Sequence, residues 1–173
     1  MGTFSKSFSG MGGYIAASKE VIDYIKAESA GILYHNSLSP VVVQQIITAF
    51  KVIMGEDGTD IGRQKLTQLM DNSNYFRTEM KKLGLHVYGD YNSPIIPVLI
   101  YFPSKIAAFS RECLARGLAV VVVGFPATSI ALSRARFCIS AGHTKEDLER
   151  AVAIISEVAD LLCLKYNNNF IGM

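Results

Sequence analysis

The sequence predicts a mixed α/β fold in which a small sheet is covered by helices. Apolar residues recur at helical spacing in two long stretches, 61–83 and 144–164. Short runs rich in β-branched residues, such as 95–102 and 119–123, have the length of strands. Because the two kinds of segment follow one another along the chain, neither an all-helical nor an all-strand fold is expected.

The expected helices begin and end at recognisable residues. Ser39 and Pro40 have the order of an N-cap followed by proline at the first helical position, which predicts a helix over 40–54. Thr144 and Asp147 have the spacing of a capping box, with Asp in place of Glu, before the last helix. Further helices are expected over 20–28 and 105–116, and further strands over 85–88 and 136–140.

The composition limits the class of protein. Half of the 173 residues are hydrophobic and the net charge is only +2, which indicates a folded chain and not a nucleic-acid-binding surface. The three cysteines lie far apart without clustered histidines, so we expect free thiols and no metal site. No apolar run reaches the roughly 20 residues that a membrane-spanning helix needs.

A change in character near 55–60 predicts the domain boundary. Residues 1–58 are expected to belong to a larger domain and 59–166 to form a small α/β domain, while 167–173 are expected to be a frayed tail. Residues 1–15 read as strand and loop, with neither a charged leader nor an apolar signal core. We therefore expect the chain to begin in mid-domain.

Lys6 gives the strongest indication of chemistry. It lies among small hydroxyl residues and aromatics in the stretch 1–8, and a glycine-rich loop follows at 10–13. A lysine that forms a Schiff base needs a partly desolvated setting, and nearby hydroxyls and backbone amides can bind a phosphate. On composition alone, a solvated surface lysine is the commoner case.

Several stretches together resemble one known family. They are 2–6, 12–14, 37–40, 120–128 and 134–144. They are similar to the α-oxoamine synthase family of enzymes that depend on pyridoxal 5'-phosphate (PLP), and more narrowly to its eukaryotic serine palmitoyltransferase type. The similarity extends from Met1 to about Tyr166. It implies the carboxyl-terminal part of the large domain, plus the small α/β domain, of a PLP-dependent transferase of fold type I.

The resemblance also implies roles for single residues. Lys6 would bind PLP covalently and act in catalysis, and Thr3 would bind the cofactor phosphate. Ser37 falls where family members reach across a dimer interface toward the phosphate of the other active site, but it could equally belong to the helix cap. Arg136 would bind the substrate carboxylate, because guanidinium is a planar and permanent charge. Thr128 lies in a loop that closes over substrate in this family.

Two neighbours of these residues are interpreted differently. Arg134 lies two residues before Arg136 and would point the same way on a regular strand, but a surface or structural salt bridge is preferred for it. Ser129 follows Thr128 where the family usually has proline, and the loss of that proline would loosen the loop.

The implied reaction condenses L-serine with palmitoyl-CoA to 3-oxosphinganine, CO2 and CoA. The resemblance also implies a heterodimer with a non-catalytic serine palmitoyltransferase subunit at the endoplasmic reticulum membrane. The active site would face the cytosol, with membrane association through the missing amino-terminal part or through partners.

Two alternatives remain open at this point. One is another α-oxoamine synthase that uses glycine or alanine with a different acyl-CoA. The other is a truncated, non-catalytic paralogue that acts as an interaction module. The family's aspartate for the pyridinium nitrogen and its ring-stacking histidine both precede the lysine, so this chain alone is expected to be inactive.

Overall fold

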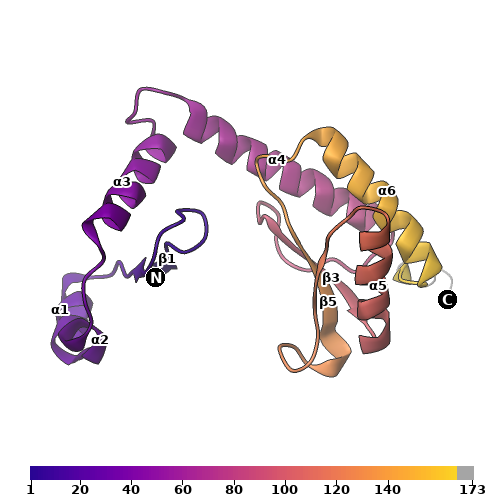
Figure 1. The fold of residues 1–173 in the computed structure, drawn as a ribbon, viewed down its shortest axis with the longest axis horizontal. Coiled ribbons are helices and arrows are strands. Elements are labelled where there is room, and N and C mark those ends of the chain that lie inside the picture. Colours follow the sequence, from indigo (N-terminus) through magenta and orange to yellow (C-terminus); the bar gives the residue numbers. More distant parts are fainter. Residues whose placement is uncertain (167–173) are drawn as a thin grey trace. The chain divides into compact units, whose positions relative to one another are not determined.

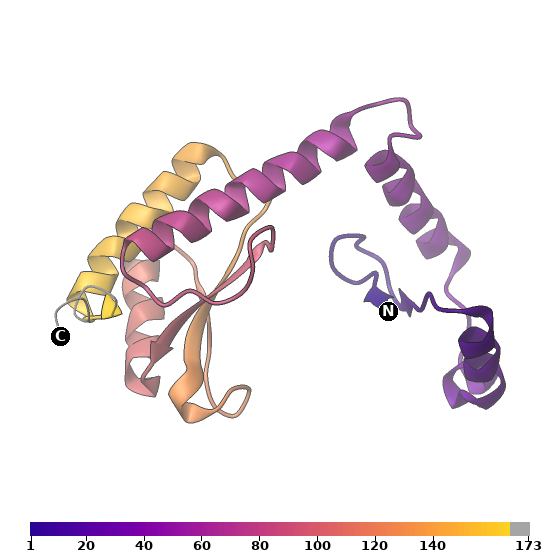
Figure 2. The same cartoon turned by 180° about the vertical axis from the view of Figure 1, so that it is seen from behind.

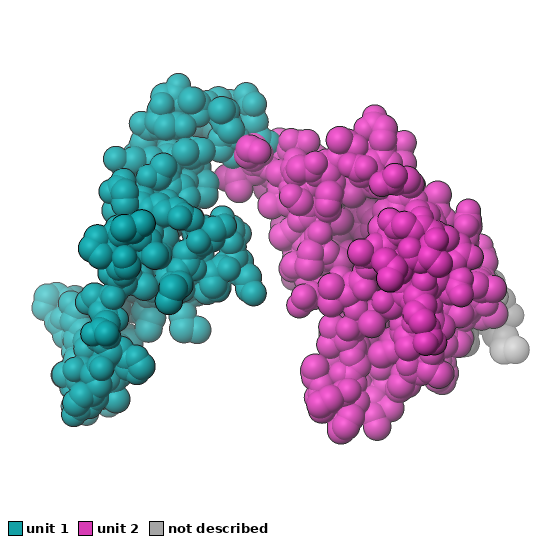
Figure 3. Space-filling model, viewed as in Figure 1, with its two compact units in different colours: residues 1–64 teal, residues 65–173 magenta. Residues whose placement is uncertain are grey.

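The computed structural model describes residues 1–166 and has the expected mixture of helices and strands (Figure 1; Figure 2, from behind). Two compact units divide the chain between Gln64 and Lys65 (Figure 3). This division lies within a helix, a few residues after the boundary expected between 58 and 59. The predicted tail, 167–173, lies outside the described residues. None of the helices described is long and apolar enough to cross a membrane.

Unit 1 contains a two-stranded ribbon and three helices. The elements are β1 (Gly2–Thr3), β2 (Gly13–Tyr14), α1 (Lys19–Glu28), α2 (Ala30–Tyr34) and α3 (Pro40–Met54). The strands β1 and β2 pair antiparallel. Helix α3 has the predicted bounds, and Ser39 occupies its N-cap position, although the serine side chain makes no capping hydrogen bond. Helix α2 was not predicted.

Unit 2 contains a three-stranded antiparallel sheet with the order β3-β5-β4. The elements are α4 (Ile61–Lys82, which begins in unit 1), β3 (Ile95–Tyr101), α5 (Pro103–Ala115), β4 (Val121–Val123), the 3-10 helix η1 (Ile130–Leu132), β5 (Ser133–Cys138) and α6 (Lys145–Leu161). Helix α6 begins with the predicted capping box, in which Thr144 and Asp147 each accept a hydrogen bond from the other's backbone N–H.

One face of the sheet is buried beneath helices. Ile96 is paired with Phe137, and Val98 with Ala135, across the two longest strands. The same core contains side chains from all three neighbouring helices, among them Phe76, Met80, Phe109, Cys113, Leu148, Ile155 and Val158. Because successive strand residues point to opposite faces, Arg136 lies on the other face of the sheet.

The three cysteines are free, and their environments differ. Cys113 is buried in this core, and burial raises the pKa of its thiol to about 11. This thiol therefore stays protonated and unreactive at neutral pH. Cys138 and Cys163 are exposed.

The strand predicted over 85–88 is wrong, because only a single bridge forms there, between Val87 and Val98. Tyr88 N–H donates to the carbonyl of Pro97 at 2.9 Å. Proline has no N–H to return, so the pairing does not extend into a regular ladder at this point.

The strand predicted over 136–140 is present but lies earlier, as β5. It begins at Ser133, which is fully buried, and ends at Cys138. After the strand, His143 N–H donates to the carbonyl of Ser140 at 3.2 Å. This turn takes the place of the last predicted strand residues.

Arg77 of α4 is a fully buried arginine that the sequence did not single out. Its Nη1 donates to the carbonyls of Tyr88 and Gly89, and its Nη2 donates to those of Ser93 and Ile95. The first three carbonyls belong to the loop that leads into β3, and Ile95 is the first residue of that strand. Arg77 therefore fastens this loop to α4 without any carboxylate partner in the described part of the chain.

Replacing Arg77 by methionine would remove the donor from four backbone carbonyls. We expect the Arg77→Met variant to lose about 3 kcal/mol of unfolding free energy, measured by urea denaturation. Lys65→Met, at an exposed position of the same helix, is the control and should unfold like the parent protein. Equal stability of the two variants would contradict the role given to Arg77.

Candidate active site

Lys6 lies in the loop between β1 and β2, and the backbone of Phe4 closes this loop. Phe4 N–H donates to the carbonyl of Gly12, and Gly10 N–H donates to the carbonyl of Phe4, each at 2.9 Å. Ser9 N–H donates to the carbonyl of Lys6 at 3.0 Å, so Lys6 begins a tight turn. The Lys6 side chain is exposed, and its amine has no hydrogen bond or ion pair within the described part of the chain.

Two hydroxyl groups precede the lysine on the same loop. Thr3 Oγ1 lies 2.8 Å from Ser5 Oγ, and it accepts a hydrogen bond from Ser5 N–H at 3.3 Å. It also donates to the carbonyl of Gly12 at 3.3 Å. The structure thus brings two predicted site residues, Thr3 and Lys6, into one loop with exposed hydroxyl groups of the kind that bind phosphate.

The loop is packed onto helix α3 by aromatic side chains. Phe4 is buried, and its ring stacks on that of Tyr14 with centroids 5.2 Å apart. Phe8 meets Phe4 edge-on at 5.6 Å and lies 4.6 Å from the ring of Phe50 on α3. These contacts give an otherwise short ribbon an apolar base.

Gln45 of α3 adds a polar contact that the sequence did not predict. Its Nε2 donates to the carbonyl of Phe8 at 3.2 Å and to that of Ser9 at 3.1 Å. Ser9 has a φ of 49°, in the left-handed region that residues with a Cβ atom rarely adopt. No local pattern indicates a contact between residues so far apart in sequence.

The glycines after Lys6 allow a close approach of backbone. A Cβ atom on Gly13 would lie 2.5 Å from the carbonyl oxygen of Gly2, so no side chain fits there. Gly12 has a φ of +85°, and a Cβ atom on it would meet Leu38 at 2.6 Å. The Leu38 side chain therefore contacts the Lys6 loop, and Ser37 is the residue before it in the sequence. The Ser37 side chain is exposed.

Unit 2 holds the remaining predicted residues. Arg136 lies on the central strand β5, paired with Pro97 and Val121 on its two sides. It is exposed and makes no hydrogen bond or ion pair with the residues described. Arg134 lies on the same face, but its Nε donates to the carbonyl of Leu132 at 3.1 Å. The salt bridge expected for Arg134 is not found among the described residues.

Thr128 lies in the loop between β4 and η1, after a cis peptide bond between Phe125 and Pro126. Its N–H donates to the carbonyl of Gly124 at 3.2 Å. Its Oγ1 is buried and has no partner in the part of the chain described. A buried hydroxyl without a partner is uncommon. Ser129 is exposed and stands at the N-cap position of η1.

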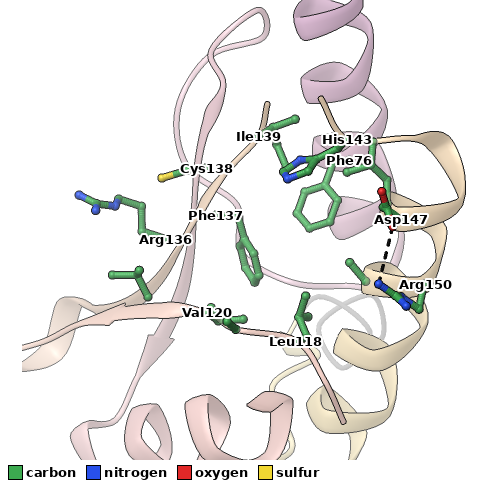
Figure 4. A pocket seen from close by; sticks show the side chains of 14 residues that line it. Phe76, Leu118, Val120, Arg136, Phe137, Cys138, Ile139, His143, Asp147 and Arg150 are labelled. Atoms are coloured by element: carbon green, nitrogen blue, oxygen red, sulfur yellow. Dashed lines mark ion pairs between the residues drawn. The ribbon is translucent and has the colours of Figure 1, made fainter. Parts of the chain in front are cut away.

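A cavity of about 440 Å³ lies beside β5 in the same unit. Its apolar lining includes Phe76, Leu118, Val120, Phe137 and Leu148. Figure 4 shows the guanidinium of Arg136 extending away from this lining, while Asp147 and Arg150 form an ion pair at its margin, 3.6 Å apart. Arg136 is among the residues that line the cavity, but its guanidinium points away from the apolar side chains.

A sequence model of the family described as aminotransferase class I and II matches residues 1–155. The chain belongs to the aminotransferase class I and II family. This family match supports the predicted α/β fold independently of the predicted helices and strands.

Within the aminotransferase class I and II family, the chain has similar relatives. It is 56% identical over 166 residues to long chain base biosynthesis protein 2a of Oryza sativa subsp. japonica, 51% over 167 residues to serine palmitoyltransferase 2 of Dictyostelium discoideum, and 47% over 169 residues to serine palmitoyltransferase 3 of Homo sapiens. These matches cover 96%, 96% and 98% of the chain but 34%, 34% and 31% of the relatives. The chain thus spans about a third of their length, and the predicted resemblance is confirmed.

Solved structures show the same fold. Serine palmitoyltransferase (SPT) from Sphingomonas wittichii has a TM-score of 0.80 at 23% identity, over 94% of this chain and 39% of that one. An SPT structure with PLP has a TM-score of 0.81 at 22% identity, over 94% and 40%. 8-Amino-7-oxononanoate synthase from Francisella tularensis has a TM-score of 0.73 at 17% identity, over 92% and 44%. The predicted fold class, α/β of PLP-dependent fold type I, is confirmed.

Proposed function

We propose that this chain is the part of a serine palmitoyltransferase that carries the cofactor lysine. The enzyme would condense L-serine with palmitoyl-CoA to 3-oxosphinganine, releasing CO2 and CoA. The observation that carries the proposal is the Lys6 loop, in which an amine without a partner among the described residues follows two exposed hydroxyls. The similarity to serine palmitoyltransferases 2 and 3 supports this substrate pair.

The residues of the loop fit PLP. Lys6 offers an accessible amine for covalent attachment, and Thr3 and Ser5 offer hydroxyls 2.8 Å apart for a phosphate. Gly12 and Gly13 bring backbone close without side chains. When bound, PLP would supply an electron sink that stabilises a carbanion at the substrate α-carbon.

The remaining roles belong to the chain's own side chains. The Lys6 amine, once free, would carry the proton to and from the substrate α-carbon. Arg136 has its donors free of partners in the described part of the chain, and it would bind the L-serine carboxylate with two parallel hydrogen bonds. Thr128 would bond substrate through its buried, unpartnered hydroxyl. Ser37 would contribute to phosphate binding, as the family resemblance implies.

The assembly is proposed on the same grounds. The protein would act as a heterodimer with a non-catalytic serine palmitoyltransferase subunit. It would work at the endoplasmic reticulum membrane, with its active site facing the cytosol. These proposals rest on the resemblance to serine palmitoyltransferases alone.

The experiment that tests the function is an absorbance spectrum of the protein, produced with its second subunit and PLP. We expect a band near the visible edge that changes on adding L-serine and is lost in Lys6→Ala, because the lysine amine forms the absorbing bond. Lys26→Ala, at an exposed lysine of unit 1, should keep the band. An unchanged band in Lys6→Ala would refute the proposed function. A response to glycine or alanine in place of L-serine would indicate a different α-oxoamine synthase.

Arg136→Lys tests the carboxylate contact. Lysine cannot make the two parallel bonds of a guanidinium, so we expect KM for L-serine to rise by about tenfold, measured by steady-state kinetics. Arg134→Lys is the matched control, because Arg134 lies on the same sheet face but is bonded to the carbonyl of Leu132. The same KM in both variants would rule out this role for Arg136.

A further inference from the structure

Gln45 connects helix α3 to the turn that carries Lys6. Its Nε2 lies 3.2 Å from the carbonyl oxygen of Phe8 and 3.1 Å from that of Ser9. A side-chain amide has two N–H donors on one nitrogen, so each carbonyl can receive its own hydrogen bond. The two carbonyls lie two and three residues after the lysine.

The turn held by Gln45 is strained. Ser9 has a φ of 49°, a left-handed conformation that costs free energy in a residue with a Cβ atom. The same serine donates its N–H to the carbonyl of Lys6 at 3.0 Å, and so it fixes the backbone of the lysine. A strained turn persists only where its surroundings hold it, and Gln45 binds the carbonyl of the strained residue itself.

The two ends of the loop are held in different ways. On the side before Lys6, Phe4 is fixed by the pairing of β1 with β2 and by its buried ring. On the side after Lys6, Gly10 N–H donates to the carbonyl of Phe4 and the Phe8 ring contacts Phe50, while Gln45 supplies the side-chain hydrogen bonds to the turn itself. Loss of the Gln45 bonds would therefore remove the side-chain support of the turn at Phe8 and Ser9, while the backbone bonds of Phe4 stay in place.

We propose that Gln45 is a positioning residue for Lys6. By holding the carbonyls of Phe8 and Ser9, it keeps the turn in the form that presents the Lys6 amine to the cofactor. The inference rests on the proposed function, because that function assigns the cofactor to Lys6. Gln45 acts through the backbone and has no reacting atom of its own.

The test is a titration of the cofactor-free protein, produced with its second subunit, with PLP. The dissociation constant is read from the absorbance of the Lys6-bound form, and the midpoint of thermal unfolding is measured beside it. Gln45→Glu keeps the size of the side chain but points an acceptor at two carbonyls. Gln44→Glu is the matched control: it makes the same change on the adjacent residue, whose amide faces Thr48 Oγ1 at 3.5 Å.

We expect Gln45→Glu to raise the PLP dissociation constant about tenfold, the effect of losing roughly 1.4 kcal/mol of hydrogen bonding. Gln44→Glu should leave the constant within about twofold, and both variants should unfold at similar temperatures because both positions are exposed. Equal PLP dissociation constants for the two variants would overturn the inference about Gln45 and leave the proposed function in place. A parent protein without the absorbance band would remove the proposed function, and the inference with it.

A further variant, Ser9→Gly, tests whether Gln45 acts by holding the strained turn at Ser9. Glycine adopts the left-handed conformation without the Cβ penalty, so the turn needs less support from Gln45. We expect Ser9→Gly, added to Gln45→Glu, to bring the PLP dissociation constant at least halfway back to that of the parent protein. If Gln45→Glu fails to fold, Gln45→Asn replaces it, because the shortened amide cannot reach both carbonyls. An unchanged constant in Gln45→Asn would equally overturn the inference.

Discussion

The backbone of Phe4 holds both ends of the loop that carries Lys6, because its N–H and its carbonyl bond to Gly12 and Gly10. Its buried ring joins the same loop to Tyr14 and, through Phe8, to helix α3. A two-stranded ribbon is too small to be stable by itself in water. The aromatic base and the bonds from α3 therefore give the lysine a defined place in an otherwise exposed segment.

In unit 2, successive side chains along β5 point to opposite faces of the sheet. The residues of the core and the arginine proposed to bind substrate therefore lie on different faces. Ser133, Ala135 and Phe137 are buried, while Arg136 lies on the opposite face and stays exposed. The core can thus be packed tightly without burying the guanidinium, which would need a partner there. The substrate contact proposed for Arg136 therefore lies on the exposed face.

Helices α3 and α6 were predictable because their ends carry local signals. Ser39 with Pro40, and Thr144 with Asp147, define helix starts through residues next to one another in the chain. The predicted roles of Lys6 and Arg136 depended on the family resemblance, since a lysine among serines is not distinctive by composition.

The contacts that escaped prediction join residues distant in sequence. Gln45 bonds a loop more than thirty residues away, and Arg77 is buried although arginine is usually exposed. Neither contact leaves a periodic pattern. The missed start of β5 has a similar cause, because Ser133 is a polar residue that is buried by packing and not by its own hydrophobicity.

The central claim is that Lys6 is the residue that binds PLP. Borohydride reduction of the cofactor-loaded protein, followed by tryptic digestion and mass spectrometry, would fix the cofactor to its lysine and locate it. The account predicts a phosphopyridoxyl group on the peptide that contains Lys6, with loss of tryptic cleavage at that residue. The same group on another lysine of the protein, with Lys6 unmodified, would contradict it.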